Sequence, residues 1–284
     1  MGWPMNYRSL LVVLDDRAAC AARVDLAIGL ARRFEGHLVG LAPTGRMPLP
    51  LDGAIGVPPP PLFEPVWENL RQRAEARAQA FRERCAAAGL HSYEAVVDDD
   101  ETATSIVQHG HCSDLIVIGQ ADPGASDHLP ARAAVEQVVL HGSRPVLVVP
   151  YAGAFERIGE QVLVAWNGGR EAARALADAI PLLCRAKQVR VMRCATPLEA
   201  DDDRAAARLE ALRRWLMWHG VDAEMRREVT PIDVGDALLS RAADDGADLI
   251  VMGAWGHTRW AERMLGGATR TLLASMTVPV LMSH

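Results

Sequence analysis

The sequence predicts an α/β protein made of two similar domains, and three observations support this class. The chain has 284 residues, a length that fits two domains of average size. Its second half alternates short β-branched runs with longer helical patterns, which is typical of a parallel sheet covered by helices on both faces. In addition, two stretches of the chain end in the same series of residues, which indicates an internal duplication.

The duplication is visible in the stretches SDLIVIG…SRPVLVVP and ADLIVMG…TVPVLMSH. Asp114, Gly119, Pro145 and Leu147 of the first match Asp248, Gly253, Pro279 and Leu281 of the second, always 134 positions later. The starts of the halves also match, with Asp15 facing Asn167, and an excess of 18 residues in the first half falls within its proline-rich segment. We therefore expect a first domain at residues 1–150, with a proline-rich insertion near 43–65, and a second domain at 151–284.

Strands and helices are expected to alternate strictly in the second half. The strands are expected at 161–166, 188–194, 222–229, 248–253 and 279–283. The helices are expected at 169–184, 204–219, 233–245 and 268–276. The two middle helices run into Gly220 and Gly246, and glycine readily adopts the left-handed conformation that ends a helix. Ligands of such parallel sheets bind beyond the carboxyl ends of the strands, where the strand order reverses.

A glycine-rich segment follows directly from one of these strand ends. It reads GAWGHTRWAERMLGGATRTLL and covers residues 253–273. Its first two glycines would let the main chain approach a ligand, and the Gly-Gly pair precedes a helix whose amides and dipole suit a phosphate. The same glycines could also serve tight turns only. Neither a Walker-type phosphate loop nor a GxGxxG dinucleotide fingerprint occurs in the chain.

The order of strand, GxxG, nine residues, glycine plus a small residue, helix and VPVL resembles the universal stress protein family. The resemblance covers both halves and implies two flavodoxin-like (HUP-type) α/β/α sandwich domains, each with a five-stranded parallel sheet. It also implies binding of ATP or AMP, with or without Mg2+, and no established catalytic role. The binding residues it implies are Ala165, Trp166 and Asn167 at the first strand, Met252 beside the nucleoside, and Gly253, Gly256, Gly266, Gly267, Ala268 and Thr269 on the phosphate and ribose loop.

Two residues depart from the family pattern. Asn167 stands where the family usually has Asp, which weakens the recognition of ribose hydroxyls, and Gly267 stands where it usually has Ser or Thr. The first half departs further, because the loop positions there are occupied by Gly119, Asp122, Arg132, Ala133 and Val135. The carboxylate of Asp122 would repel a phosphate. We expect this half to serve packing, with a second, unusual site as the alternative.

The amino-acid composition argues against nucleic acid and membranes as binding partners. A net charge of −6 offers no basic field to nucleic acid or to an anionic membrane. The longest apolar runs reach about eight residues, well short of the roughly 20 that a membrane-spanning helix needs. Five scattered cysteines without a CxxC motif predict reduced thiols and a cytoplasmic protein.

Several other motifs favour structural interpretations. HGHC at 109–112 has residue types that bind zinc, but it matches a helix end of the other half. DDDE at 98–101 predicts helix capping, and 68–85 predicts an amphipathic helix with a solvated face. Trp166 and Trp255 could stack on an adenine ring, fill the pocket or pack at a domain interface.

The leading prediction is a stress-response protein that binds an adenine nucleotide in its C-terminal half, as a sensor or interaction module. The alternative is a nucleotide-free interaction scaffold that contacts a partner through the proline-rich segment or the tryptophans. Slow ATP hydrolysis is the most activity that we predict, and Asp233 and Asp236 are the acidic residues considered for it. The two domains are expected to form an internal pseudo-dimer in which RPVLVV and VPVLM meet, and the whole chain could form a homodimer.

Overall fold

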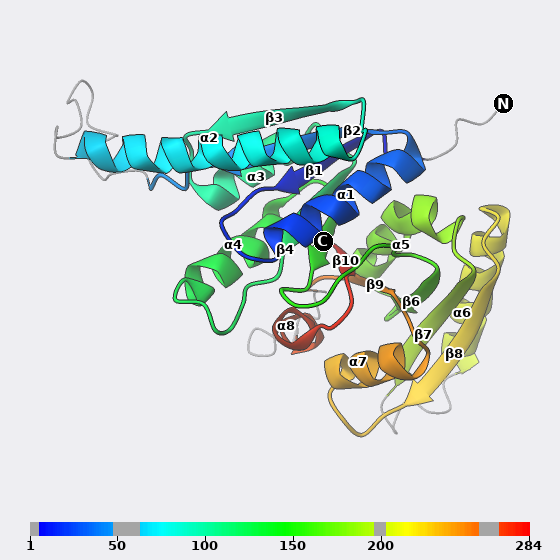
Figure 1. Cartoon of the computed structure of the whole chain (residues 1–284). Helices are drawn as coiled ribbons and strands as arrows, with labels where there is room; N and C mark the ends of the chain where they lie inside the picture. The colour runs from blue at the N-terminus through cyan, green and yellow to red at the C-terminus, as the bar shows by residue number, and fades with distance from the viewer. Residues whose placement is uncertain (1–5, 48–62, 196–202, 256–266) are drawn as a thin grey trace.

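The computed structural model describes residues 6–47, 63–195, 203–255 and 267–284, in which strands and helices alternate along the chain (Figure 1). The N-terminal half contains β1 (Ser9–Val13), α1 (Cys20–Phe34), β2 (His37–Pro43), α2 (Glu64–Ala87), β3 (Tyr93–Asp98), α3 (Thr102–Gly110), β4 (Leu115–Gly119), α4 (His128–His141) and β5 (Val146–Val149). The C-terminal half contains β6 (Gln161–Ala165), α5 (Arg170–Leu183), β7 (Gln188–Ala195), α6 (Asp203–Trp218), β8 (Ala223–Val229), α7 (Val234–Asp244), β9 (Leu249–Gly253), α8 (Gly267–Ser275) and β10 (Val280–Ser283).

The predicted elements of the C-terminal half are confirmed, since each predicted end lies within one residue of the observed one. The expected helix stops are also present. Gly220 and Gly246 have φ values of +77° and +60°, the left-handed conformation that glycine adopts without a steric penalty.

All the strands belong to one sheet, in the order β3-β2-β1-β4-β5-β10-β9-β6-β7-β8. Neighbouring strands within each half are parallel, so each half contributes a five-stranded parallel sheet, as predicted. The two last strands, β5 and β10, pair with each other in the antiparallel direction, with Leu147 opposite Leu281. The contact expected between RPVLVV and VPVLM is therefore present.

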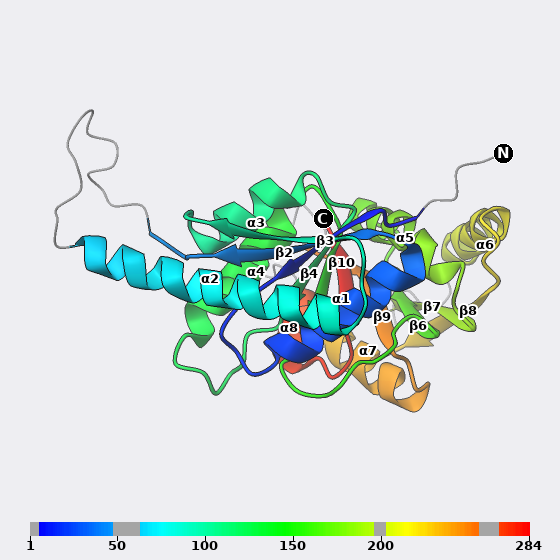
Figure 2. The ribbon, with the colours of Figure 1, turned by 45° about the horizontal axis from the view of Figure 1, so that its top comes forward.

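Helices cover both faces of this sheet and form the predicted α/β/α layers. Buried side chains of α1, α2, α5 and α6 pack in one hydrophobic cluster, and those of α3, α4, α7 and α8 pack in another. Figure 2 shows α2 and α3 on opposite sides of the N-terminal strands. The first cluster runs without interruption from one half of the chain to the other.

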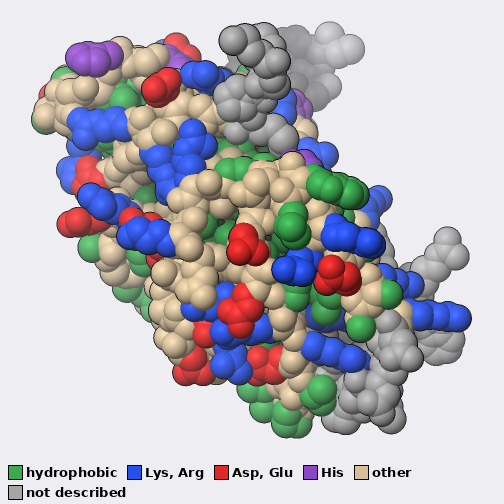
Figure 3. All heavy atoms as spheres, turned by 90° about the vertical axis from the view of Figure 1, so that its right-hand side faces the viewer, with side chains coloured by type: hydrophobic (Ala, Val, Ile, Leu, Met, Phe, Trp, Pro, Cys, Tyr) green, Lys and Arg blue, Asp and Glu red, His purple; other side chains and the backbone are tan. Residues whose placement is uncertain are grey.

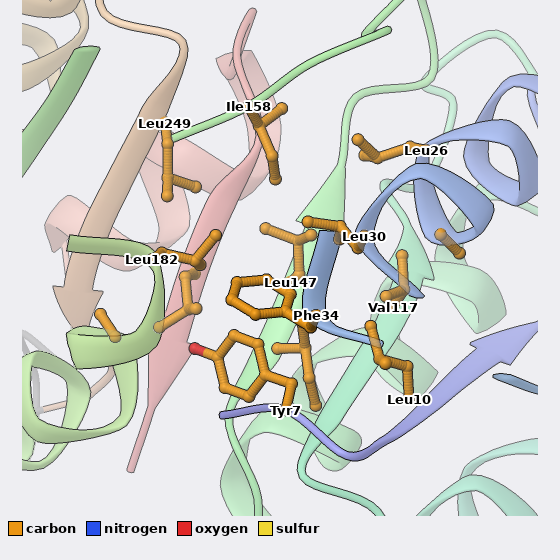
Figure 4. Packing of buried hydrophobic residues seen from close by; sticks show 14 of the residues in the cluster. Tyr7, Leu10, Leu26, Leu30, Phe34, Val117, Leu147, Ile158, Leu182 and Leu249 are labelled. Atoms are coloured by element: carbon orange, nitrogen blue, oxygen red, sulfur yellow. The ribbon is translucent and has the colours of Figure 1, made fainter. Parts of the chain in front are cut away.

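Aromatic residues join the halves within this first cluster. Tyr7 and Phe34 meet edge to face with ring centroids 5.0 Å apart, and both rings are buried. The Tyr7 hydroxyl donates a hydrogen bond to the backbone carbonyl of Asp178 at 2.6 Å, which links the N-terminal half to α5. Figure 4 shows Tyr7 and Phe34 facing Leu182 of the C-terminal half. None of the helices in the described ranges is both long enough and apolar enough to cross a membrane.

Candidate functional site

The strand order of the C-terminal half reverses at β6. The next strand in the chain, β7, pairs with β6 on one side, whereas the later strand β9 pairs with it on the other side. Ala165 at the end of β6 and Gly253 at the end of β9 therefore lie on neighbouring strands. This is the position at which open α/β sheets bind ligands. Two of the predicted segments are thus brought to one edge of the sheet.

The turn after β6 is closed by Asn167. Its Oδ1 accepts a hydrogen bond from the amide of Gly169 at 2.8 Å, and Gly168 between them has a φ of +76°. The amide nitrogen Nδ2 of Asn167 remains as a donor, and the residue is exposed. Trp166 is partly buried and packs against the first hydrophobic cluster, so it takes part in packing at this end of the strand.

Gly253 is required by the packing of α5 against β9. A Cβ atom at this position would lie 2.4 Å from the amide nitrogen of Ala172 and 2.4 Å from the carbonyl carbon of Glu171. Both are backbone atoms of the first turn of α5, which cannot move aside independently. Met252, the residue before it, is 5% exposed and belongs to the second hydrophobic cluster. The end of β9 is therefore tightly packed against α5 and the second hydrophobic cluster.

The start of α8 is the third part of the predicted site. Gly267 is exposed and Ala268 is half-buried, whereas Thr269 is buried. The Oγ1 atom of Thr269 accepts a long hydrogen bond of 3.4 Å from the amide of Trp255, so this hydroxyl bridges the glycine-rich segment at its two ends. Trp255 has a φ of +47°, an uncommon value for a residue with a side chain. Gly256 and Gly266 of the predicted set lie outside the described residues.

An acidic side chain stands beside the start of α8. Asp233 caps α7, its Oδ1 accepting a hydrogen bond from the amide of Gly235 at 2.8 Å. Its other oxygen lies 3.4 Å from the position that a Cβ of Gly267 would occupy. The N-terminal ends of α7 and α8 are thus close together, with a carboxylate between them. An anion bound here would share the dipoles of two helices but would meet one negative charge.

Glu171 is a residue of this region that sequence reasoning missed. It lies in the first turn of α5, is 5% exposed, and forms an ion pair of 3.2 Å with Arg170. Its Oε2 lies 3.4 Å from the position of a Cβ at Gly169, close to the side chain of Asn167. The sequence signal was an acidic residue two positions after the Gly-Gly pair that precedes α5, where the helix dipole favours a carboxylate.

The matching position of the N-terminal half contains a cavity of about 650 Å³. It is lined by residues at the ends of β1, β2 and β4, among them Leu14, Thr44 and Ile118, and by α4 residues such as Ala134. We expected this half to serve packing, with an unusual site as the alternative. The cavity leaves room for a small molecule, since ligand pockets commonly measure about 300 to 1,000 Å³.

Arg23 is a buried basic residue that occupies the space between Gly119 and the end of β1. Its side chain is 1% exposed and donates to the carbonyl of Val13 at 2.9 and 3.1 Å and to Asp15 at 2.9 Å. A Cβ at Gly119 would lie 2.2 Å from its Nη1, so the glycine kept in this half makes room for a guanidinium. Asp15, the acid retained at the first strand end, is therefore neutralised within the protein.

Two motifs that we interpreted as structural, DDDE and HGHC, lie at the ends of α3. Glu101 of DDDE caps this helix, accepting hydrogen bonds of 2.9 Å from the amides of Ala103 and Thr104. His109 of HGHC lies in the last turn and its Nε2 is 3.2 Å from Asp98, which also accepts a hydrogen bond of 2.6 Å from the Ser105 hydroxyl. Both motifs therefore stabilise the ends of α3.

No curated protein matches the sequence significantly. A universal stress protein from Archaeoglobus fulgidus superimposes with a TM-score of 0.72 over 97% of this chain and 95% of its own, at 17% identity. A functionally unknown protein from Pseudomonas aeruginosa superimposes with a TM-score of 0.61 over 98% and 92% of the two chains, also at 17% identity.

At this level of identity the two solved structures show the fold, and they show it for both halves. The family itself comes from the sequence, because residues 160–284 match the model of the universal stress protein family. Residues 160–284 therefore belong to the universal stress protein family, and the N-terminal half repeats the fold of that family.

Proposed function

We propose that this chain binds an adenine nucleotide, ATP or AMP, at the ends of β6 and β9 and acts as a stress-response sensor or interaction module. The observation that carries the proposal is the position of Gly253 and the start of α8. Both belong to the glycine-rich segment, and Gly253 ends the strand at which the order of the sheet reverses. A cytoplasmic location is part of the proposal, supported by five cysteines that are all free thiols.

Different residues at this edge would contact the adenine, the ribose and the phosphate of the nucleotide. Ala165 and Trp166 would face the adenine, and the free Nδ2 of Asn167 would donate to the ribose. The backbone amides of Gly267 and Ala268 and the dipole of α8 would hold a phosphate. Because Asp233 and Glu171 add negative charge, AMP or ATP neutralised by Mg2+ would bind better than free ATP.

We also propose that the chain is an internal pseudo-dimer of two domains, 1–150 and 151–284. β5 ends at Val149 and β6 begins at Gln161, so a division at this point leaves five strands in each half. The antiparallel pair of β5 and β10 supplies the contact that relates the halves. Association of two whole chains into a homodimer is the further step that a measurement of solution mass would test.

A pair of matched substitutions tests the nucleotide site. Ala268 at the start of α8 and Ala134 in α4 are separated by the repeat distance of 134 residues, and both are half-buried. We expect Ala268→Asp to weaken ATP binding at least about tenfold, since a carboxylate would stand within a few ångströms of the phosphates. Ala134→Asp should leave the affinity unchanged. Calorimetric titration of each purified variant with AMP and with ATP and Mg2+ measures both.

Two other outcomes contradict the proposal in different ways. Loss of binding in Ala134→Asp alone would move the nucleotide to the cavity of the N-terminal half, which Ala134 lines. A wild-type chain that binds neither nucleotide at millimolar concentration would favour the nucleotide-free scaffold. A thermal unfolding scan of each variant without ligand shows whether the substitutions leave the fold intact.

A further inference from the structure

A second cavity lies at the junction of the two halves, away from both strand-end regions. It measures about 390 Å³ and is formed by α1, by the connection between β5 and β6, and by the turn between α5 and β7. Its lining residues are Leu26, Gly29, Leu30, Arg33, Glu156, Arg157, Ile158, Glu160, Arg185 and Lys187. The cavity thus draws on the N-terminal half, the connection and the C-terminal half together.

Positive charge is concentrated in this lining. Four of the ten lining residues are basic and two are acidic, although the whole chain carries a net charge of −6. On the side of the molecule drawn in Figure 3, by comparison, acidic and basic side chains are interspersed. Basic groups held close together repel each other unless an anion lies between them. The excess of positive charge therefore requires an explanation.

Two of the basic groups, Arg33 and Arg185, lie near the same ring, that of Phe34. The guanidinium of Arg33 donates to the carbonyl of Ile158 at 2.6 Å and to that of Arg185 at 3.2 Å. The guanidinium of Arg185 lies over the ring of Phe34, 4.6 Å from its centroid. Burial lowers the pKa of Arg33 and the positive charge of Arg185 lowers it further, whereas the carboxylates of Asp248 and Glu160 raise it by less. Each guanidinium group thus has contacts of its own with backbone carbonyls or the Phe34 ring in the absence of a ligand.

The other two basic groups, Arg157 and Lys187, are exposed, as Arg185 is, and they make ion pairs instead of contacts with backbone carbonyls or rings. Lys187 pairs with Glu160 at 2.5 Å, and Arg157, 83% exposed, lies 4.0 Å from the same carboxylate. Exposed ion pairs of this kind contribute little to stability, so both side chains can turn towards a ligand at small cost. Leu26, Leu30 and Ile158 give the cavity an apolar wall. The cavity therefore offers both charged and apolar contacts.

We infer that this junction cavity binds a small anionic molecule that carries a phosphate or carboxylate group. Arg33 and Arg185 hold the anion, while Lys187 and Arg157 turn towards it. Since the ligand contacts α1 and the α5–β7 turn at once, it stabilises the contact between the two halves. This inference does not depend on the nucleotide site, which lies at the ends of β6 and β9.

Inorganic pyrophosphate is the probe for this site, titrated into the full chain at constant ionic strength. We expect binding by calorimetry and a rise in the thermal unfolding midpoint. In the double variant Arg157→Gln/Lys187→Gln, the affinity should fall at least about tenfold, because two charge-assisted contacts are lost. The matched control is Arg71→Gln/Arg82→Gln, which removes the same charge from exposed positions on α2 and should bind as the wild type does.

The inference is overturned if the wild type shows no binding at millimolar pyrophosphate, or if both double variants respond alike. Pyrophosphate could also bind at the start of α8, and Ala268→Asp separates the two places. That variant should retain the pyrophosphate response at the junction, and loss of the response in it alone would assign the anion to the nucleotide site instead. Titration with citrate at the same ionic strength shows whether carboxylates bind as phosphates do.

Discussion

Gly253 shows how one residue can satisfy two interpretations of the same motif. The sequence suggested either close approach of the main chain to a ligand or a tight turn. In the structure the missing side chain makes room for the first turn of α5, which lies 2.4 Å from where a Cβ would be. The glycine thus brings a helix N-terminus up to the ends of β6 and β9. Packing requires this glycine whether or not a nucleotide binds.

Substitution of Gly253 by alanine should therefore destabilise the protein. The new Cβ would overlap backbone atoms of Glu171 and Ala172, and such overpacking costs about 1 to 3 kcal/mol. Gly29 in α1 is the control, since a Cβ there would lie at an ordinary 3.8 Å from the nearest atom. Gly29→Ala should be neutral or stabilising by up to about 1 kcal/mol. Denaturant unfolding followed by circular dichroism gives both values, and equal stability of the two variants would refute the packing argument.

Side-chain partners across the sheet are what the sequence could not predict. Nothing near Gly119 indicates that Arg23, almost a hundred positions earlier, fills the space beside it. The bond between Thr269 and the amide of Trp255 likewise depends on where the fold places the end of β9 and the start of α8. Glu171 could have been noticed as an acidic residue at a helix start, but its burial depends on β9. These contacts arise from tertiary structure, which periodicity does not encode.

Single elements, by contrast, follow from local patterns. The predicted helix at 169–184 is observed at Arg170–Leu183, because its apolar positions recur with the helical period and a Gly-Gly pair precedes it. The acidic motif before α3 was also sufficient to predict a cap, although Glu is not among the residues preferred there. Burial raises the pKa of Glu101, but hydrogen bonds from the amides of Ala103 and Thr104 and from the Thr104 hydroxyl lower it, and the lowering dominates.

Removal of this cap should weaken α3 in a pH-dependent way. Glu101→Ala is expected to lose about 1 kcal/mol at neutral pH, within the usual range of about 0.5 to 2 for a helix cap. Because the folded state holds the pKa of Glu101 below its ordinary value, the contribution is present at neutral pH and disappears as the pH falls through the lowered pKa. Thermal unfolding of the variant and the wild type at several pH values measures the difference.

The neighbouring exposed residue supplies the control for the cap. Asp100→Ala removes the same charge one position earlier, and no hydrogen bond of Asp100 to the start of α3 is part of the cap described above. If Asp100→Ala destabilises the chain as much as Glu101→Ala, the effect belongs to local charge rather than to capping. A difference that persists unchanged at acidic pH would contradict the role of the ionised carboxylate.

At the scale of the whole molecule, the two halves share one sheet and one continuous hydrophobic cluster. The duplication predicted that the last strands would meet, but the composition of the shared core was not evident from the sequence. Tyr7 precedes the first strand, and nothing local indicates that its hydroxyl reaches the carbonyl of Asp178. Such contacts make the halves dependent on each other for stability.

We therefore expect the chain to unfold in a single cooperative transition. Phe34→Ala should lower the free energy of unfolding by about 3 to 5 kcal/mol, because Phe34 is fully buried at the junction and touches Tyr7. Leu129→Ala, at a position 76% exposed, should change it by less than about 0.5 kcal/mol. Differential scanning calorimetry tests the transition, and two separate peaks in the wild type would show that the halves unfold independently.

The antiparallel pair of β5 and β10 also determines which edge of the sheet each strand-end region occupies. At this join the strands of one half run against those of the other, so their carboxyl ends point to opposite sides. The cavity at the ends of β1 and β4 and the candidate site at the ends of β6 and β9 consequently open on opposite edges of the sheet. A molecule bound at one of these two edges would therefore leave the other unobstructed.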